Sequence, residues 1–240
     1  MCSPSLTRGV ALACLLAAAS QASASGLQVA PTSLELAASG PAQALWLTNT
    51  GDHALHAQVR AYKWSQASGK DDLAATQDVV ASPPMLDVPA GGRQLVRVIR
   101  TGAAAAGEQT YRLLVDELPV GGEAKQTGVQ YVLRYSVPVF VGASGTPSLQ
   151  WSTKVDNEGL KVEIHNSGTA HAQVSYVSLQ PAGGAPVEVV PGLLGYVLPG
   201  ATMHWTVALP AGANAANASL KALVNGQSTE QTLSPGAPAR

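Results

Sequence analysis

Turn-forming residues recur along this chain at short intervals, and this spacing restricts its possible folds more than any other feature of the sequence. With 24 Gly, 16 Pro and only 12% charged residues, the composition does not fit a chain of long continuous helices. No segment shows the apolar spacing of an amphipathic helix of convincing length. The sequence therefore predicts an all-β protein. The clearest turns lie at Ser39–Pro41, Asn49–Gly51, Ser68–Gly69, Pro89–Gly92 and Val120–Gly122.

The strand-like segments fall into two groups separated by a linker-like stretch at Gly142–Pro147. A β-sandwich has about 100 residues, so 240 residues suit two of them. We place the boundary near residue 145, with domains at 25–144 and 145–240. Each half carries an Asn-x-Gly turn after an apolar strand, at Asn49 and Asn166, which suggests two similar sandwiches. The expected strands lie near 27–37, 43–49, 54–64, 76–81, 93–100, 109–118 and 128–141, then 148–155, 159–166, 170–180, 186–190, 202–209 and 219–224.

Residues 1–24 have the pattern of a secretory signal peptide. Arg8 precedes an apolar run from Val10 to Ala19, and Ala22–Ala24 forms a small-residue cleavage site. The run is too short for a permanent membrane span. Both cysteines, Cys2 and Cys14, lie in this segment, so no disulfide is expected in the exported protein. The charge balance gives no sign of a nucleic-acid or lipid-binding surface.

The segment from residue 128 to residue 141 alternates over an unusual length. Its odd positions are all apolar, whereas its even positions mix apolar, polar and charged residues, which predicts a strand with one continuous apolar face. Pro138 cannot donate to a sheet ladder, so an edge position is expected. The residues alone leave two interpretations open. The segment is either the last core strand of a sandwich, or an edge strand that another chain pairs with by β-augmentation.

A series of motifs in one order resembles the PapD-like pilus chaperones and covers nearly the whole exported chain. The resemblance implies two Ig-like β-sandwich domains joined at an angle, with a cleft between them. It also implies a periplasmic chaperone that binds pilus subunits and delivers them to an outer-membrane usher. The motifs are Leu45–Asn49, Ser82–Pro84, Pro89–Gly92 before Arg93–Arg97, Tyr111–Pro119 and Leu133–Phe140, while Pro191–Gly200 is similar to the second domain of the archaic, spore-coat-U-type branch.

Chaperones of this family lend the last strand of their first domain to a subunit that lacks one, which is donor-strand complementation. Mapped onto this sequence, the resemblance implies a row of donated side chains that starts before Leu133 and continues beyond it. Whether the free chain associates with itself to cover this row is left open. The row is Val129, Tyr131, Leu133, Tyr135 and Val137.

Classical members of the family hold the subunit's C-terminal carboxylate with an Arg on the first strand and a Lys on the donor strand. This sequence has Ser33 and Pro138 at those two places. Arg97 and Arg134 are the expected substitutes, because an Arg can bind a carboxylate with two hydrogen bonds. Arg100 and Lys63 are weaker candidates.

No residue set in the sequence predicts catalysis, a cofactor or a metal site. The five histidines, His53, His56, His165, His171 and His204, are scattered and have no ligand-type spacing with Cys or carboxylates. Two alternatives to the chaperone remain. A structural pilus or surface component would normally have one incomplete Ig-like domain. A periplasmic enzyme or carbohydrate-binding sandwich would need convergent polar residues or a metal set.

Overall fold

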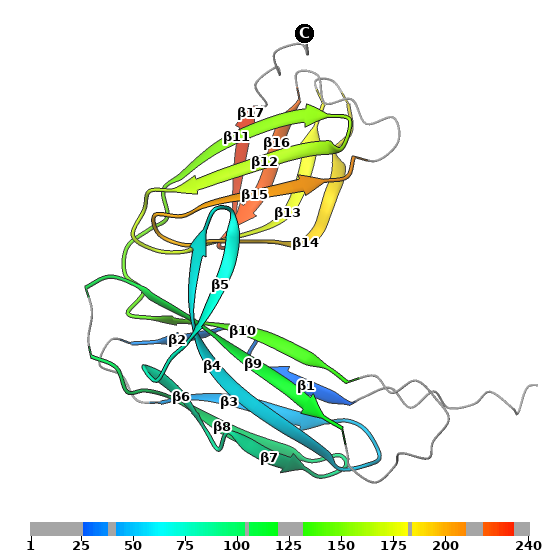
Figure 1. Cartoon of the computed structure of the whole chain (residues 1–240). Coiled ribbons are helices and arrows are strands. Elements are labelled where there is room, and N and C mark those ends of the chain that lie inside the picture. Colours follow the sequence, from blue (N-terminus) through cyan, green and yellow to red (C-terminus); the bar gives the residue numbers. More distant parts are fainter. Residues whose placement is uncertain are drawn as a thin grey trace, which may run out of the picture.

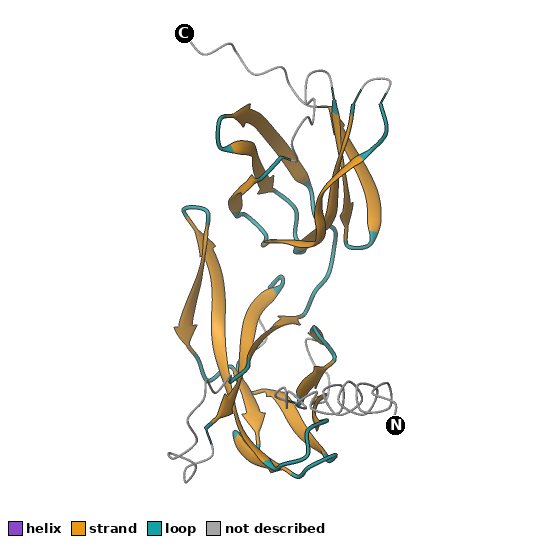
Figure 2. Cartoon of the chain, turned by 90° about the vertical axis from the view of Figure 1, so that its right-hand side faces the viewer, coloured by secondary structure: helices purple, strands orange, loops and turns teal. Residues whose placement is uncertain are grey.

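The computed structural model describes residues 26–37, 42–103, 106–119, 132–181, 184–209 and 218–232, and the regular elements in these ranges are strands (Figure 1). No helix in the described part is long and apolar enough to cross a membrane. The strands form four sheets that pair into two sandwiches, and Figure 2 shows loops at the strand ends of both. The fold is therefore all-β, as the sequence predicts.

The first sandwich contains a four-stranded sheet in the order β1-β3-β8-β6 and a six-stranded sheet in the order β2-β10-β9-β4-β5, with β7 also paired to β4. Val, Leu and Ala side chains from both sheets form its core. Its strands are β1 Leu27–Ala30, β2 Leu34–Leu36, β3 Gln43–Asn49, β4 Leu55–Ala67, β5 Lys70–Ala75, β6 Val79–Ser82, β7 Met85–Val88, β8 Arg93–Arg100, β9 Gln109–Leu118 and β10 Arg134–Val141.

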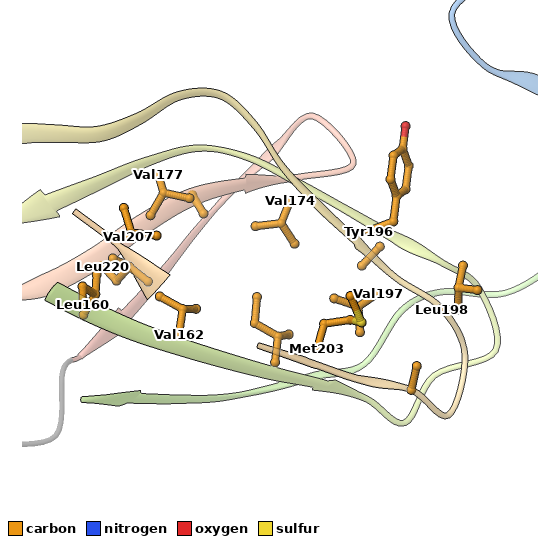
Figure 3. Packing of buried hydrophobic residues seen from close by; sticks show 14 of the residues in the cluster. Leu160, Val162, Val174, Val177, Tyr196, Val197, Leu198, Met203, Val207 and Leu220 are labelled. Carbon is orange, nitrogen blue, oxygen red and sulfur yellow. The ribbon is translucent and has the colours of Figure 1, made fainter. Parts of the chain in front are cut away.

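The second sandwich contains a three-stranded sheet, β11-β12-β15, and a four-stranded sheet, β14-β13-β16-β17. No strand lies between Val141 and Leu149. Figure 3 shows the apolar side chains that fill this sandwich, with Tyr196 turned away from the rest. Its strands are β11 Leu149–Asp156, β12 Gly159–Asn166, β13 Ala172–Gln180, β14 Val187–Val197, β15 Thr202–Val207, β16 Ser219–Val224 and β17 Gln227–Thr232.

The observed strands differ from the expected ones at several places. The strand expected from residue 128 begins only at Arg134, so the described residues Val132 and Leu133 precede it. The strand expected at 27–37 is two short strands, and β1 and β2 belong to different sheets. The strands β5, β7 and β17 were missed, and β14 continues through Pro191 and Gly192 to Val197. All six residues of β5 are exposed and β17 is polar throughout, so neither has the apolar alternation by which strands are recognised.

A buried asparagine has the same role in each sandwich. Asn49 donates to the carbonyls of His53 and Val88 and accepts from the amide of Gly51. Asn166 donates to the carbonyls of Ala170 and Val197 and accepts from the amides of Gly168 and Ser148. Each amide side chain is fully hydrogen-bonded, so its burial carries little desolvation cost. The repeated turn motif thus marks a real structural correspondence between the halves.

Aromatic side chains of the first sandwich complete the core of the second. Trp64 on β4 and Phe140 on β10 are buried in the cluster that fills the second sandwich. The Trp64 and Tyr196 rings meet edge to face, with centroids 5.6 Å apart. The two sandwiches therefore share apolar surface and are not independent bodies on a bare linker.

Polar contacts fix the same junction. The β4–β5 hairpin reaches the second sandwich, where Gln66 donates to the carbonyl of Tyr196 (2.9 Å) and accepts from the amide of Leu198 (2.9 Å). The Glu108 carboxylate accepts from the amide of His171 and contacts its Nδ1 at 2.8 Å. The His171 ring also stacks on Phe140, with centroids 3.4 Å apart and planes 3° apart. These directional contacts set the angle between the sandwiches.

Candidate functional site

Strand β10 is an edge strand along the first part of its length. It pairs with β9 from Arg134 to Val141, whereas on its other side β2 pairs only with residues 139–141. Among the described residues, no strand pairs with 134–138 on that side. Pro138, opposite Arg112 of β9, lies in this open stretch, where a missing N–H costs no ladder bond.

The apolar row changes its environment along β10. Val137 and Val139 are buried in the first core, and Leu133 and Tyr135 pack against that core while staying partly exposed. The Tyr135 hydroxyl donates to the carbonyl of Leu27. Val137 thus supports its own domain in this structure, while the accessible part of the row begins at Tyr135 and runs back toward Leu133. The predicted positions Val129 and Tyr131 lie outside the described residues.

Two acidic residues of β9 fix the start of β10. The backbone amide of Glu117 donates to the carbonyl of Leu133, and the Glu117 side chain accepts from the amide of Leu133. Asp116, whose side chain is 10% exposed, accepts hydrogen bonds from Arg134 and Arg60. Partial burial alone would raise the pKa of Asp116, but the hydrogen bonds from the two arginines outweigh it and hold the pKa below its usual value.

Replacing Asp116 by Asn is expected to destabilise the fold in a pH-dependent way. The folded-state pKa of Asp116 is lowered, so its stabilising effect is present above the unfolded-state pKa of about 4 and is lost as the pH falls through the folded-state value. We expect Asp116→Asn to lower the free energy of unfolding by about 1–2 kcal/mol at pH 7, since both arginines are partly exposed. Urea unfolding of both proteins at pH 7 and pH 3 measures this. A deficit of equal size at both pH values would contradict it.

The structure does not bring the two predicted anchors together. Arg134 pairs with Asp116 at the start of β10. Arg97 is exposed on β8, in the other sheet of the sandwich, between Ala44 of β3 and Ser82 of β6. Of the weaker candidates, Lys63 lies over the ring of Tyr111 at 4.3 Å.

A cleft of about 410 Å³ lies where the two sandwiches meet, and its charged lining is mostly acidic. Ser33 and Phe140 line it from the first sandwich. The ionisable residues among its lining are Glu35, Glu108, His171 and Tyr196, and none is Lys or Arg. Neither Arg97 nor Arg134 is part of this lining.

Arg112 is the basic residue that the sequence reasoning missed near this junction. Its guanidinium lies 3.7 Å from the ring centroid of Trp64 and 5.4 Å from that of Tyr196. The side chain is 13% exposed and lies 3.7 Å from the Asp71 carboxylate. Burial lowers the pKa of Arg112, and Asp71 partly opposes this. The alternation of the sequence could have indicated this position. Tyr111 and Leu113 point into the core, so Arg112 between them lies on the opposite face of the strand.

A family described as "Pili and flagellar-assembly chaperone, PapD N-terminal domain" matches residues 26–146, half of the chain. The chain belongs to this family. The comparison with curated proteins gave no match. The fold and the expected family are therefore confirmed.

Solved structures of pilus chaperones have the same two-domain fold. One chain of the Acinetobacter baumannii CsuC–CsuE chaperone–tip adhesion subunit complex, from archaic Csu pili, is 24% identical, with a TM-score of 0.62 over 86% of this chain and 97% of that one. In the Salmonella enterica complex of SafA pilin with the SafB chaperone, one chain is 15% identical, with a TM-score of 0.60 over 89% and 99%. The Pseudomonas aeruginosa CupB2 chaperone is 18% identical, with a TM-score of 0.57 over 87% and 100%.

Because the chain belongs to this family, the residues at the two classical anchor positions can be compared with the cleft. Ser33, at the position expected for the classical Arg, does line the cleft and has no charge. Pro138, at the position expected for the classical Lys, lies directly opposite Arg112 on the neighbouring strand. Arg112 is thus the positively charged residue paired with Pro138 across the two strands.

Proposed function

We propose that this protein is a periplasmic chaperone that binds and stabilises pilus subunits by donor-strand complementation and passes them to an outer-membrane usher. The main support is the open edge of β10 at residues 134–138, which follows the apolar alternation of Val129, Tyr131 and Leu133 in the sequence. In this proposal residues 1–24 are a signal peptide, the domains are 25–144 and 145–240, and the Pro191–Gly200 motif places the protein in the archaic branch. The role is binding, without catalysis.

The apolar row would supply most of the affinity. Burying Val129, Tyr131 and Leu133 is worth roughly 5–8 kcal/mol before ordering costs are subtracted. Tyr135 would extend the row, and Val137 would fix it to the chaperone's own core. Backbone hydrogen bonds along the open edge would set the register, as in other cases of strand addition.

We further propose Arg112 as the group that binds the subunit's C-terminal carboxylate, with Arg97 as the alternative. Arg112 lies at the junction of the two sandwiches and beside the classical Lys position. Its carboxylate partner Asp71 is 3.7 Å away, a loose pair that a better placed carboxylate could replace. Arg134 already pairs with Asp116, so we assign it to holding the start of the donor strand.

Co-expression in the periplasm with a pilus subunit encoded beside this gene tests the proposed function. We expect the subunit to accumulate only when this chain is present and to co-purify with it in a 1:1 complex. Stable accumulation of the subunit without the chain would contradict the chaperone role. Measurable turnover of a small-molecule substrate by the purified chain would support the enzyme alternative instead.

A further inference from the structure

The second sandwich exposes two large side chains side by side on neighbouring strands. Tyr176 on β13 is 56% exposed and Leu193 on β14 is 54% exposed. Ser175 pairs with Leu193 on one side and with Leu223 of β16 on the other, so the two leucines flank Ser175 in one row across the sheet. We call Tyr176, Leu193 and Leu223 the Tyr176 patch.

The backbone at the centre of this patch has an unusual conformation. Tyr176 has a φ of 51°, in the left-handed region that residues with large side chains rarely adopt. The pairing with β16 passes from Ser175 to Ser178 on β13 while β16 moves only from Leu223 to Lys221, so β13 contains an extra residue here. Such bulges redirect a side chain and are often found at functional sites. This bulge places the Tyr176 ring in solvent while Val174 and Val177 stay buried.

The patch lies on the sheet face that leads into the cleft. Gln173 and Tyr196 line the cleft, and the Gln173 side chain donates to the Tyr196 hydroxyl. On β13, Ser175 lies on the same face as Gln173, two residues further along, and Tyr176 follows it. Figure 3 shows Tyr196 pointing out of the sandwich, whereas Val174 and Val177 lie inside it. The outer face of the sheet that carries the patch therefore reaches the cleft at Gln173, two residues before Ser175.

The cleft joins the sheet that carries the patch to the strands around the donor edge. Glu35 of β2 and Phe140 of β10 line it together with Gln173 and Tyr196 of the second sandwich, and Figure 1 shows β10 on the side of the first sandwich that faces the second. A strand added to this edge lies on the side of β10 away from β9, the side on which β2 pairs with the end of β10. A subunit domain held there would have the cleft, and with it the second sandwich, beside it.

We propose that the Tyr176 patch is a second contact surface for the pilus subunit that β10 holds. The inference rests on the proposed function and adds a partner surface on the second domain. The occupant is the apolar surface of an Ig-like subunit beside its unfilled groove. The patch residues carry no charge, which suits an apolar partner better than an acidic one. Two exposed side chains, Tyr176 and Leu193, next to the half-buried Leu223 form the kind of apolar surface that marks a protein interface.

Two substitutions in the patch, with matched controls, test this inference in the full chain. Tyr176→Gly removes the ring and places at φ 51° the residue that tolerates it best, so the melting temperature is expected to stay level or rise. Affinity for the co-purified subunit is expected to fall about tenfold, and Leu193→Ser is expected to do the same. Tyr176→Phe should bind as the parent does. Val155→Ser alters a 42% exposed residue in the other sheet of this sandwich and should leave affinity unchanged.

The outcomes separate this inference from the proposed function. Leu133→Asp is measured in parallel, because it tests the donor strand alone. Loss of binding in Leu133→Asp with affinity unchanged in Tyr176→Gly, within about twofold, overturns only the patch. Full binding in Leu133→Asp overturns the donor strand, and a tenfold loss in Tyr176→Gly would then still support the patch. If Tyr176→Gly abolishes self-association of the free chain without changing subunit affinity, a second copy occupies the patch and the inference is wrong.

Discussion

Leu133→Asp is expected to abolish the complex with the pilus subunit, with affinity reduced at least about a hundredfold. Burying a Leu side chain is worth about 1.5–3 kcal/mol, and an unpaired carboxylate in an apolar groove adds a further penalty. Leu133 is the last described residue of the apolar row before β10 begins, and it packs only at the margin of the first core. Titration of refolded or complexed subunit against purified parent and variant measures the effect.

Val132→Asp is the matched control for this substitution. Val132 is 48% exposed and, as the neighbouring residue in an alternating row, points to the opposite face. The same charge placed one residue away should leave subunit capture within about threefold of the parent, since it enters no groove pocket. Equal losses of subunit affinity in the two variants would contradict a donated row. The same holds if only Leu133→Asp has a melting temperature so low that the variant is unfolded in the assay.

Arg112→Ala is expected to weaken subunit binding about ten- to a hundredfold through loss of the carboxylate contact. A charge-assisted hydrogen bond contributes about 1.5–3 kcal/mol, which corresponds to this range. The substitution also removes a cation–π contact with Trp64, so a fall in melting temperature alone does not identify an anchor. The decisive measurement is a thermodynamic cycle in which the subunit's C-terminal carboxylate is amidated.

In that cycle, amidation of the subunit's C-terminus should lower its affinity for the parent chaperone. It should change the affinity for Arg112→Ala little or not at all. Arg112→Lys retains the charge but loses the planar fork and should fall between the two. Arg97→Ala, measured in the same cycle, should behave as the parent. If the coupling appears with Arg97 and is absent with Arg112, the anchor lies on β8 and our assignment to β9 is wrong.

The alternation of side chains predicted most of the strands, because burial on one face leaves a period of two residues in the sequence. The strands β3, β8, β9, β12 and β16 have the expected bounds or differ by a single residue. The turn residues at Asn49 and Asn166 also indicated the correspondence between the sandwiches, which the buried amide contacts bear out. The local sequence pattern was enough to predict a strand wherever the strand had one face in the core and one in solvent.

Strands without an apolar, buried face were missed, even where they pair with the strand directly before them, as β5 and β17 do. Strand β5 has no buried residue, and its hairpin is held by Gln66, whose partners are 130 and 132 residues away. Pro191 and Gly192 are residues that usually end a strand, but here they lie inside β14. Bulges that shift the register between β13 and β14 accommodate them.

The candidate site was predicted only in part for a similar reason. Leu133 and Tyr135 belong to an alternating row visible in the sequence, whereas the role of Arg134 depends on Asp116, a partner on another strand. Arg112 was overlooked because its aromatic neighbours come from β4 and from the second sandwich. Charged residues acquire their roles from packing that joins distant segments.

The sharing of Trp64 and Phe140 between the two halves has a practical consequence for making shorter proteins. A fragment ending near Val141 would present both rings to water and, with the Tyr196 side missing, would tend to aggregate. A soluble recombinant half-molecule would therefore need polar replacements at these two rings. In the intact protein, the same replacements would remove the aromatic contacts that hold the two sandwiches at a fixed angle, and with them the geometry in which a subunit is bound.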